Sequence, residues 1–174
     1  MNMKKLVFFA CLVLTAELLS AQLYSGIKSR LAFPLNDEQE IDYGIGAGLQ
    51  LGYSVGEHFD LEIGAGNVWY KSMFQNYRVR SVEAGARYSV FNYPVKPFIG
   101  FGTGYFQKKF DGPFDSEFSE NGIGIIPSAG AVFDVKTVKN LSVITEISYN
   151  KIFFKHQMSV LSINLGVYYS FKRN

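Results

Sequence analysis

YGIGAGLQLGYSV, residues 43–55, alternates without a break between two kinds of side chain. Its odd-numbered positions are apolar or aromatic, and its even-numbered positions are glycine, glutamine or serine. Because successive side chains of a β-strand point to opposite faces, this alternation predicts one long strand with an apolar face and a face of small residues. Its length exceeds the roughly 9–11 residues with which a tilted strand crosses a membrane.

Other parts of the chain repeat this pattern. Two clear repeats are Leu141–Tyr149 and Leu161–Phe171. Five weaker segments bring the predicted strands to eight: Leu23–Phe33, Phe59–Tyr70, Tyr77–Val90, Phe98–Gln107 and Gly122–Val135. Between Tyr77 and Val90 the apolar positions change from odd to even numbers, which we interpret as a β-bulge near Ser81, since one extra residue reverses the facing of all that follow.

The first residues are typical of a cleavable secretory signal. Lys4 and Lys5 precede the apolar run Leu6–Leu14, and small residues follow it up to Ala21. We therefore expect a signal peptide over residues 1–21 and one mature domain over residues 22–174.

The only cysteine, Cys11, lies inside the apolar run, so the expected mature chain has no thiol for disulfides, catalysis or metal binding. A lipid anchor on Cys11 is the alternative, with an apolar region of only five residues before it. Without Lys4, Lys5 and Glu17 the chain has 15 basic and 14 acidic residues. This near balance gives no polybasic surface for nucleic acid.

The connections between predicted strands alternate between longer polar segments and shorter ones. The longest are Pro34–Asp42 and Lys108–Asn121, which fall at the same end of an up-and-down arrangement. Long outer loops and short inner turns are the arrangement of outer-membrane barrels. An even number of strands then places both termini on the periplasmic side.

The strand charges share a face with the glycines. A soluble barrel needs Lys and Glu on its outer wall, whereas glycines suit a crowded interior. We expect a structural network of paired charges inside the barrel, formed by Lys28, Arg30, Glu62, Glu83, Arg87 and Glu146, with Asp60 on the same face. The alternative is that Glu83, Arg87 and Glu146 form a gate or proton path.

Aromatic residues near the strand ends predict two girdles flanking an apolar band. The expected girdle beside the short turns contains Tyr53, Phe59, Tyr88, Phe98, Phe133, Tyr169 and Phe171, and the girdle beside the long loops contains Phe33, Tyr43, Trp69, Tyr105 and Tyr149.

The stretches Lys96–Tyr105 and Leu165–Phe171 resemble a middle and a closing strand of the small eight-stranded outer-membrane barrels, the OmpA-like and OmpX-like group. The resemblance covers the whole expected mature chain. It implies an all-β fold, an eight-stranded antiparallel up-and-down transmembrane β-barrel, and recognition by the barrel-assembly machinery. In that family a terminal aromatic residue commonly ends the last strand, whereas here three residues follow Phe171.

The leading functional hypothesis is a non-enzymatic, monomeric barrel of the bacterial outer membrane, with a filled lumen, a structural or surface-interaction role, no cofactor and no bound metal. Its expected partners are outer-membrane lipids and lipopolysaccharide, with Arg78 and Arg80 as candidates for lipid-phosphate contacts. One alternative is a narrow channel or small-ligand transporter. The other is a lipid A deacylase using His156 and Ser159, with Glu146 to orient the histidine. His58 is expected at the opposite end of the barrel from His156, which forbids a shared metal site.

Overall fold

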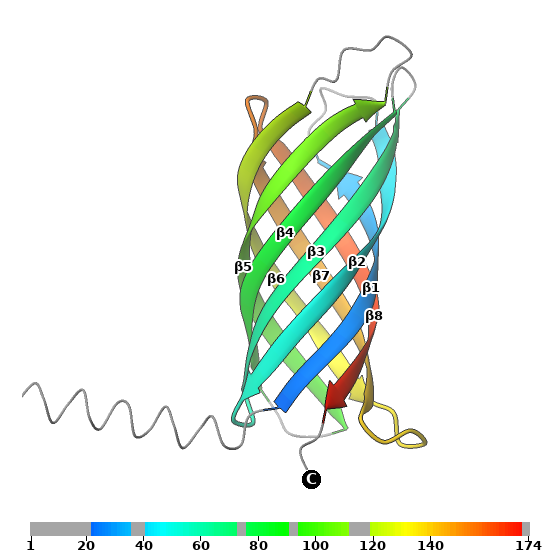
Figure 1. The fold of residues 1–174 in the computed structure, drawn as a ribbon, viewed down its shortest axis with the longest axis vertical. Coiled ribbons are helices and arrows are strands. Elements are labelled where there is room, and N and C mark those ends of the chain that lie inside the picture. Colours follow the sequence, from blue (N-terminus) through cyan, green and yellow to red (C-terminus); the bar gives the residue numbers. More distant parts are fainter. Residues whose placement is uncertain (1–21, 36–40, 73–75, 91–93, 112–118, 172–174) are drawn as a thin grey trace, which may run out of the picture.

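Eight antiparallel strands form one closed barrel in the computed structural model (Figure 1). The structure describes residues 22–35, 41–72, 76–90, 94–111 and 119–171. The strands are β1 (Gln22–Pro34), β2 (Ile41–Val55), β3 (Phe59–Ser72), β4 (Asn76–Ser89), β5 (Val95–Asp111), β6 (Ser119–Asp134), β7 (Leu141–Phe153) and β8 (Met158–Phe171). Each strand pairs with the next along the chain, and β1 closes the barrel by pairing with β8.

The predicted fold class is confirmed. Every predicted strand lies on an observed one, with ends that agree within four residues. Within the described residues, no helix is long and apolar enough to cross a membrane. The predicted signal peptide, residues 1–21, lies outside the described residues.

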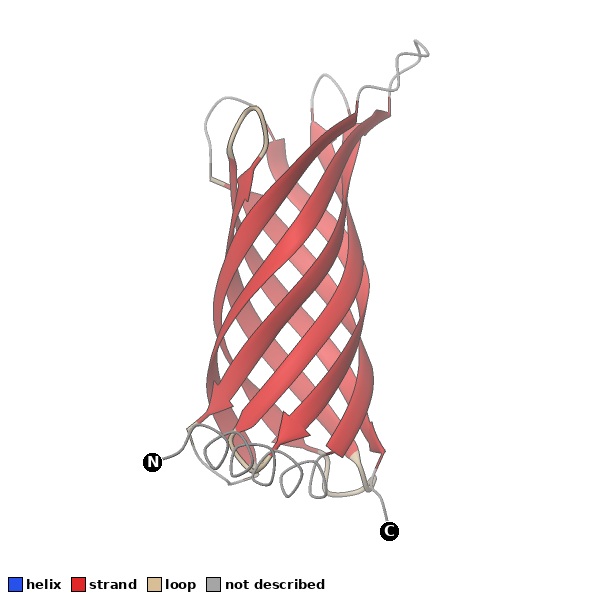
Figure 2. Cartoon of the chain, turned by 60° about the vertical axis from the view of Figure 1, so that its left-hand side comes forward, coloured by secondary structure: helices blue, strands red, loops and turns tan. Residues whose placement is uncertain are grey.

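The strands run between the two ends of the barrel, and the turns that the structure describes lie at these ends (Figure 2). β1 begins and β8 ends at the same end, here called the termini end, and the opposite end is called the loop end. The connections at the loop end are residues 35–40, 73–75, 112–118 and 154–157, and those at the termini end are residues 56–58, 90–94 and 135–140. The strands run further toward the loop end than predicted, so the two sets differ less in length than the sequence suggested.

The prediction of a β-bulge near Ser81 is wrong. β4 pairs in unbroken register with β3, from Tyr70 opposite Tyr77 to Phe59 opposite Tyr88, and in unbroken register with β5 as well. Tyr77 and Val79 therefore face the lumen, where they are buried. The change in parity arises because the lumen of this barrel is itself apolar near the loop end.

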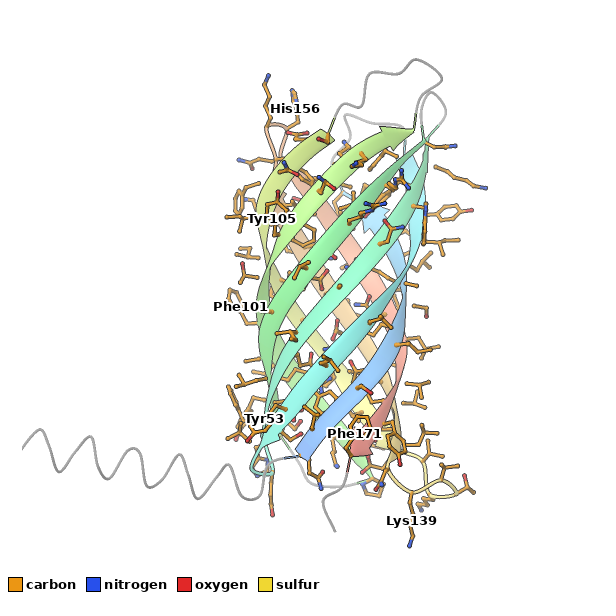
Figure 3. All side chains as sticks on the ribbon, viewed as in Figure 1. Tyr53, Phe101, Tyr105, Lys139, His156 and Phe171 are labelled. Carbon is orange, nitrogen blue, oxygen red and sulfur yellow. The ribbon has the colours of Figure 1, made fainter. Side chains whose placement is uncertain are left out.

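The outer wall of the barrel is apolar. Mid-wall side chains such as Leu49, Val82 and Phe101 are 61–68% exposed. Phe101 points away from the barrel at mid-height, with Tyr105 toward the loop end and Tyr53 toward the termini end (Figure 3). The wall thus presents an apolar band between aromatic rims, as a lipid-facing surface requires.

Phe98 is an exception to the predicted girdles. It is only 2% exposed and faces the lumen, because even-numbered residues of β5 point inward, as its neighbours Gly100 and Gly102 do.

Inward-facing glycines make room for large rings on neighbouring strands. Tyr24 lies opposite Gly52 across β1 and β2, and Tyr168 lies opposite Gly26 across β8 and β1. A Cβ atom on Gly52 would lie 1.9 Å from Cζ of Tyr24, and one on Gly26 would lie 1.9 Å from Cδ1 of Tyr168. Each ring therefore occupies the volume that a side chain on its partner would need.

Gly52→Ala should destabilise the folded barrel by about 1–3 kcal/mol, because the added methyl group displaces the Tyr24 ring from a filled lumen. Gly66→Ala is the matched control, since its Cβ meets nothing nearer than the Ser81 hydroxyl at 3.3 Å and that hydroxyl can rotate. The free energy of unfolding in urea, measured in lipid vesicles, compares the two variants. Equal losses would show that the ring and glycine pairs do not limit the packing.

Candidate functional site

The lumen is divided into three layers along the barrel. An apolar layer near the loop end contains buried residues including Val68, Tyr70, Tyr77, Val79, Phe106, Ile152, Phe154, Met158 and Val160. A second cluster, Tyr24, Phe98, Ile144 and Tyr168, lies toward the termini end. The polar and charged side chains form a belt between these two layers.

Arg30 and Glu83 form the most regular ion pair of this belt. Nη1 and Nη2 of Arg30 donate to the two carboxylate oxygens of Glu83 at 2.8 and 3.0 Å. The Ser81 hydroxyl donates a further hydrogen bond to Glu83 at 2.8 Å. This two-point contact joins β1 to β4 across the lumen and fixes the orientation of the guanidinium plane.

Lys28 and Glu146 form a second pair, 3.1 Å apart, between β1 and β7. The Asn164 amide connects the two pairs: its nitrogen donates to Glu146 at 2.9 Å, and its oxygen accepts from Nε of Arg30 at 3.0 Å. Glu146 and Asn164 are at most 8% exposed. Burial of unpaired charges would be costly, and this chain of contacts supplies each with a partner.

Arg87 forms a separate cluster nearer the termini end. Its Nη2 lies 2.7 Å from Glu62 and 3.2 Å from Asp60, and it donates to the Tyr24 hydroxyl at 2.8 Å. Glu62 also accepts hydrogen bonds from Tyr24 and from Gln50. One cation therefore holds two carboxylates together on β3.

Aromatic rings surround the Arg87 guanidinium. Its Cζ lies 4.9 Å from the ring centre of Phe98, 5.5 Å from that of Tyr168 and 5.7 Å from that of Tyr24. Desolvated cations are attracted to ring faces at such distances. The three rings and Arg87 therefore pack together at this level of the lumen.

The six predicted network residues all lie in the lumen, but in two groups. Lys28, Arg30, Glu83 and Glu146 form one group, and Arg87 with Glu62 forms the other. The uncharged partners of these charges were not predicted from the sequence: Asn164, Gln50, Tyr24 and Tyr168. Their even numbers place them on the lumen face, and that parity was the signal that could have found them.

The free space in the lumen includes two cavities of very different size, and Arg87 lines both. A cavity of about 80 Å³ lies among the belt charges and the glycines of β2 to β5. A vestibule of about 1120 Å³ opens at the termini end and stops at Tyr24, Arg87 and Tyr168.

The structure does not assemble the constellation expected of a deacylase. Glu146 faces the lumen, bonded to Lys28 and Asn164, whereas Ser159 lies on the outward face of β8, bonded to the Tyr149 hydroxyl at 3.1 Å. Ser159 and the position opposite Glu146 are five residues apart on β8, roughly 16 Å along the strand.

The two histidines lie at opposite ends of the barrel. His58 lies in the turn between β2 and β3, with Nδ1 2.9 Å from the Ser89 carbonyl oxygen, and His156 lies at the loop end (Figure 3). Among the described residues, no group of three or more His, Cys, Asp or Glu side chains could hold a metal ion.

An apolar wall around a polar, paired lumen defines a small membrane-spanning β-barrel. Residues 10–171 match the outer membrane protein β-barrel domain family, and the chain belongs to that family.

Solved structures show the same fold at low sequence identity. Neisserial surface protein A has a TM-score of 0.66 at 18% identity, over 87% of this chain and 97% of that one. The attachment invasion locus protein Ail of Yersinia pestis has a TM-score of 0.59 at 18% identity, over 87% and 97%. OprG of Pseudomonas aeruginosa has a TM-score of 0.59 at 13% identity, over 88% and 96%. No curated protein matches the chain in sequence.

Arg87→Ala should destabilise the barrel by about 3–5 kcal/mol, because it leaves Asp60 and Glu62 without their buried cation. Lys96→Ala is the control: it removes a pair with Asp134 of similar length, 3.0 Å, but with side chains that are 32% and 48% exposed. Such a pair contributes about 0–1 kcal/mol. Urea unfolding in lipid vesicles measures both.

A triple variant that adds Asp60→Asn and Glu62→Gln to Arg87→Ala distinguishes two causes of the lost stability, unpaired charge and lost packing. Partial recovery of stability is expected, since no carboxylate then remains unpaired. If the triple variant is no more stable than Arg87→Ala alone, loss of packing rather than stranded charge accounts for the effect.

Proposed function

We propose that this chain is a non-enzymatic outer-membrane barrel with a structural or surface-interaction role and a lumen sealed by its own side chains. The observation that carries this proposal is the pair of buried apolar layers on either side of the ion-paired belt. One layer surrounds Tyr77, and the other is formed by Tyr24, Phe98, Ile144 and Tyr168. An eight-stranded barrel has an interior just wide enough for side chains, and the buried side chains of these two layers support a closed lumen. Interaction with the surroundings then falls to the loops and the outer wall.

The proposal includes an orientation and a route to the membrane. Residues 1–21 act as the signal peptide, residues 22–174 form the barrel, and both termini face the periplasm, so that the loop end faces outward. The barrel-assembly machinery inserts the chain, which functions as a monomer in contact with lipids and lipopolysaccharide. The even strand number and the family membership support this arrangement.

The folded protein should migrate faster unheated than boiled on a detergent gel, because a closed barrel has no free strand edge at which unfolding can start. In planar bilayers it should give no steady conductance, since side chains block both ends of the belt. Absence of the heat-dependent shift would contradict the closed barrel. Large stable channels would instead favour the channel alternative.

Incubation with lipid A should release no acyl chains in mass spectrometry, because Ser159 lies outside the barrel and Glu146 inside it. Release that is lost in both His156→Ala and Ser159→Ala would reverse this assignment. Release that survives both substitutions would indicate a contaminating enzyme.

A further inference from the structure

Several basic side chains lie on the outer wall of the barrel near one end. Among the outward strand positions whose side chains the structure describes, the charged residues are Lys71, Arg78, Arg80, Lys109 and Lys151. All five lie near the loop end. At the termini end, the outward positions of the described strands hold only uncharged residues such as Leu23, Tyr53 and Phe171.

Four of these cations are neighbours on three adjacent strands. Arg78 of β4 is directly opposite Lys109 of β5, and on its other side it is opposite Trp69 of β3. Arg80 and Lys71 lie two residues from Arg78 and Trp69, on the same face. Directly opposed residues are about 5 Å apart and residues two apart on a strand are about 7 Å apart, so the four form one continuous patch.

We propose that this patch, formed by Lys71, Arg78, Arg80 and Lys109, binds the phosphate groups of a phosphorylated membrane lipid. Lysine and arginine side chains at a membrane surface attract anionic lipid headgroups, and arginine can hold phosphate with two hydrogen bonds. The outward positions of β1, of residues 43–55 of β2 and of β8 hold uncharged residues, so the lipid is bound on one side of the barrel.

The surroundings of the patch select a lipid over free phosphate. Trp69 and Tyr105 lie beside the cations and are each 52% exposed, as aromatic residues at the membrane interface are. Toward mid-wall the same face continues with Val82 and Phe101, 63% and 61% exposed. A lipid whose phosphates contact Arg78 and Arg80 therefore has an apolar surface directly adjacent for its acyl chains.

Trp69 is the only tryptophan in the chain and lies within the patch, so its fluorescence reports binding directly. The purified full chain, folded in phosphatidylcholine vesicles, is titrated with bisphosphorylated lipid A. A saturable change in Trp69 emission is expected. The same titration with dephosphorylated lipid A should give no saturable change, and an equal response to both lipids would overturn the proposal.

The double variant Arg78→Gln, Arg80→Gln should bind lipid A about 25-fold more weakly, since each cation near a membrane surface is worth about fivefold in affinity. The matched control, Lys151→Gln with Lys155→Gln, removes two lysines at the same end of the barrel but on the side of β7. It should change the affinity less than threefold. Equal losses in the two double variants would overturn the proposal.

Two further experiments test whether charge and a lipid are required for binding. Arg78→Lys with Arg80→Lys keeps the charges and should stay within about fivefold of the wild type, while heat-dependent gel migration verifies that each variant is folded. Millimolar inorganic phosphate should not displace lipid A, and full displacement would assign the patch to free phosphate instead. This inference rests on the proposed function in one respect: the proposed orientation of the barrel decides on which side of the membrane the patch meets the lipid. Ion conduction or acyl release would refute the proposed function and leave this titration unaffected.

Discussion

The fixed width of the interior is the constraint on which the rest of the structure depends. Eight strands enclose a space that side chains can just fill. A large inward side chain at one level of the barrel therefore requires a small inward residue beside it. Where a strand contributes a ring, as at Tyr24 or Tyr168, the position opposite is a glycine. Within residues 43–55, Gly44 and Gly52 therefore complement the rings of Tyr70 and Tyr24, which lie elsewhere in the sequence.

Filling the lumen removes water, and the arrangement of charge follows from that. Arg30 contacts Glu83 with both terminal nitrogens, and Arg87 lies among three rings while holding two carboxylates. A buried ion pair is not in itself evidence of stability, since apolar residues of similar volume often do as well. The Arg30 contact, however, joins strands that are not neighbours in the sheet. It can form only when the barrel has closed in the observed register, so it distinguishes this closure from a slipped one.

Much of this fold could be predicted from the sequence because a period of two determines both the strands and their faces. The same rule failed locally where the lumen is apolar. Tyr77 and Val79 were expected to face lipid because they are hydrophobic, yet they fill the lumen, and the bulge inferred to explain them does not exist. Phe98 was misplaced for the same reason. Hydrophobicity distinguishes lipid from water, but it does not distinguish lipid from a sealed interior.

The partners in the lumen could not be predicted for a different reason. The contact between Arg30 and Glu83 spans 53 residues, and that between Lys28 and Glu146 spans 118. Which inward residues share a level depends on the tilt and stagger of the strands, which alternation does not encode. Inside the barrel, each belt cation therefore needs a carboxylate at its own level. On the outer wall, Arg78 and Arg80 of β4 lie beside Lys109 of β5, and in our proposal a lipid phosphate adds negative charge to this patch from outside the chain. The two faces of β4 therefore carry charge for different purposes. Inward Glu83 pairs with Arg30 within the fold, and outward Arg78 and Arg80 belong to the patch that we propose binds a lipid phosphate.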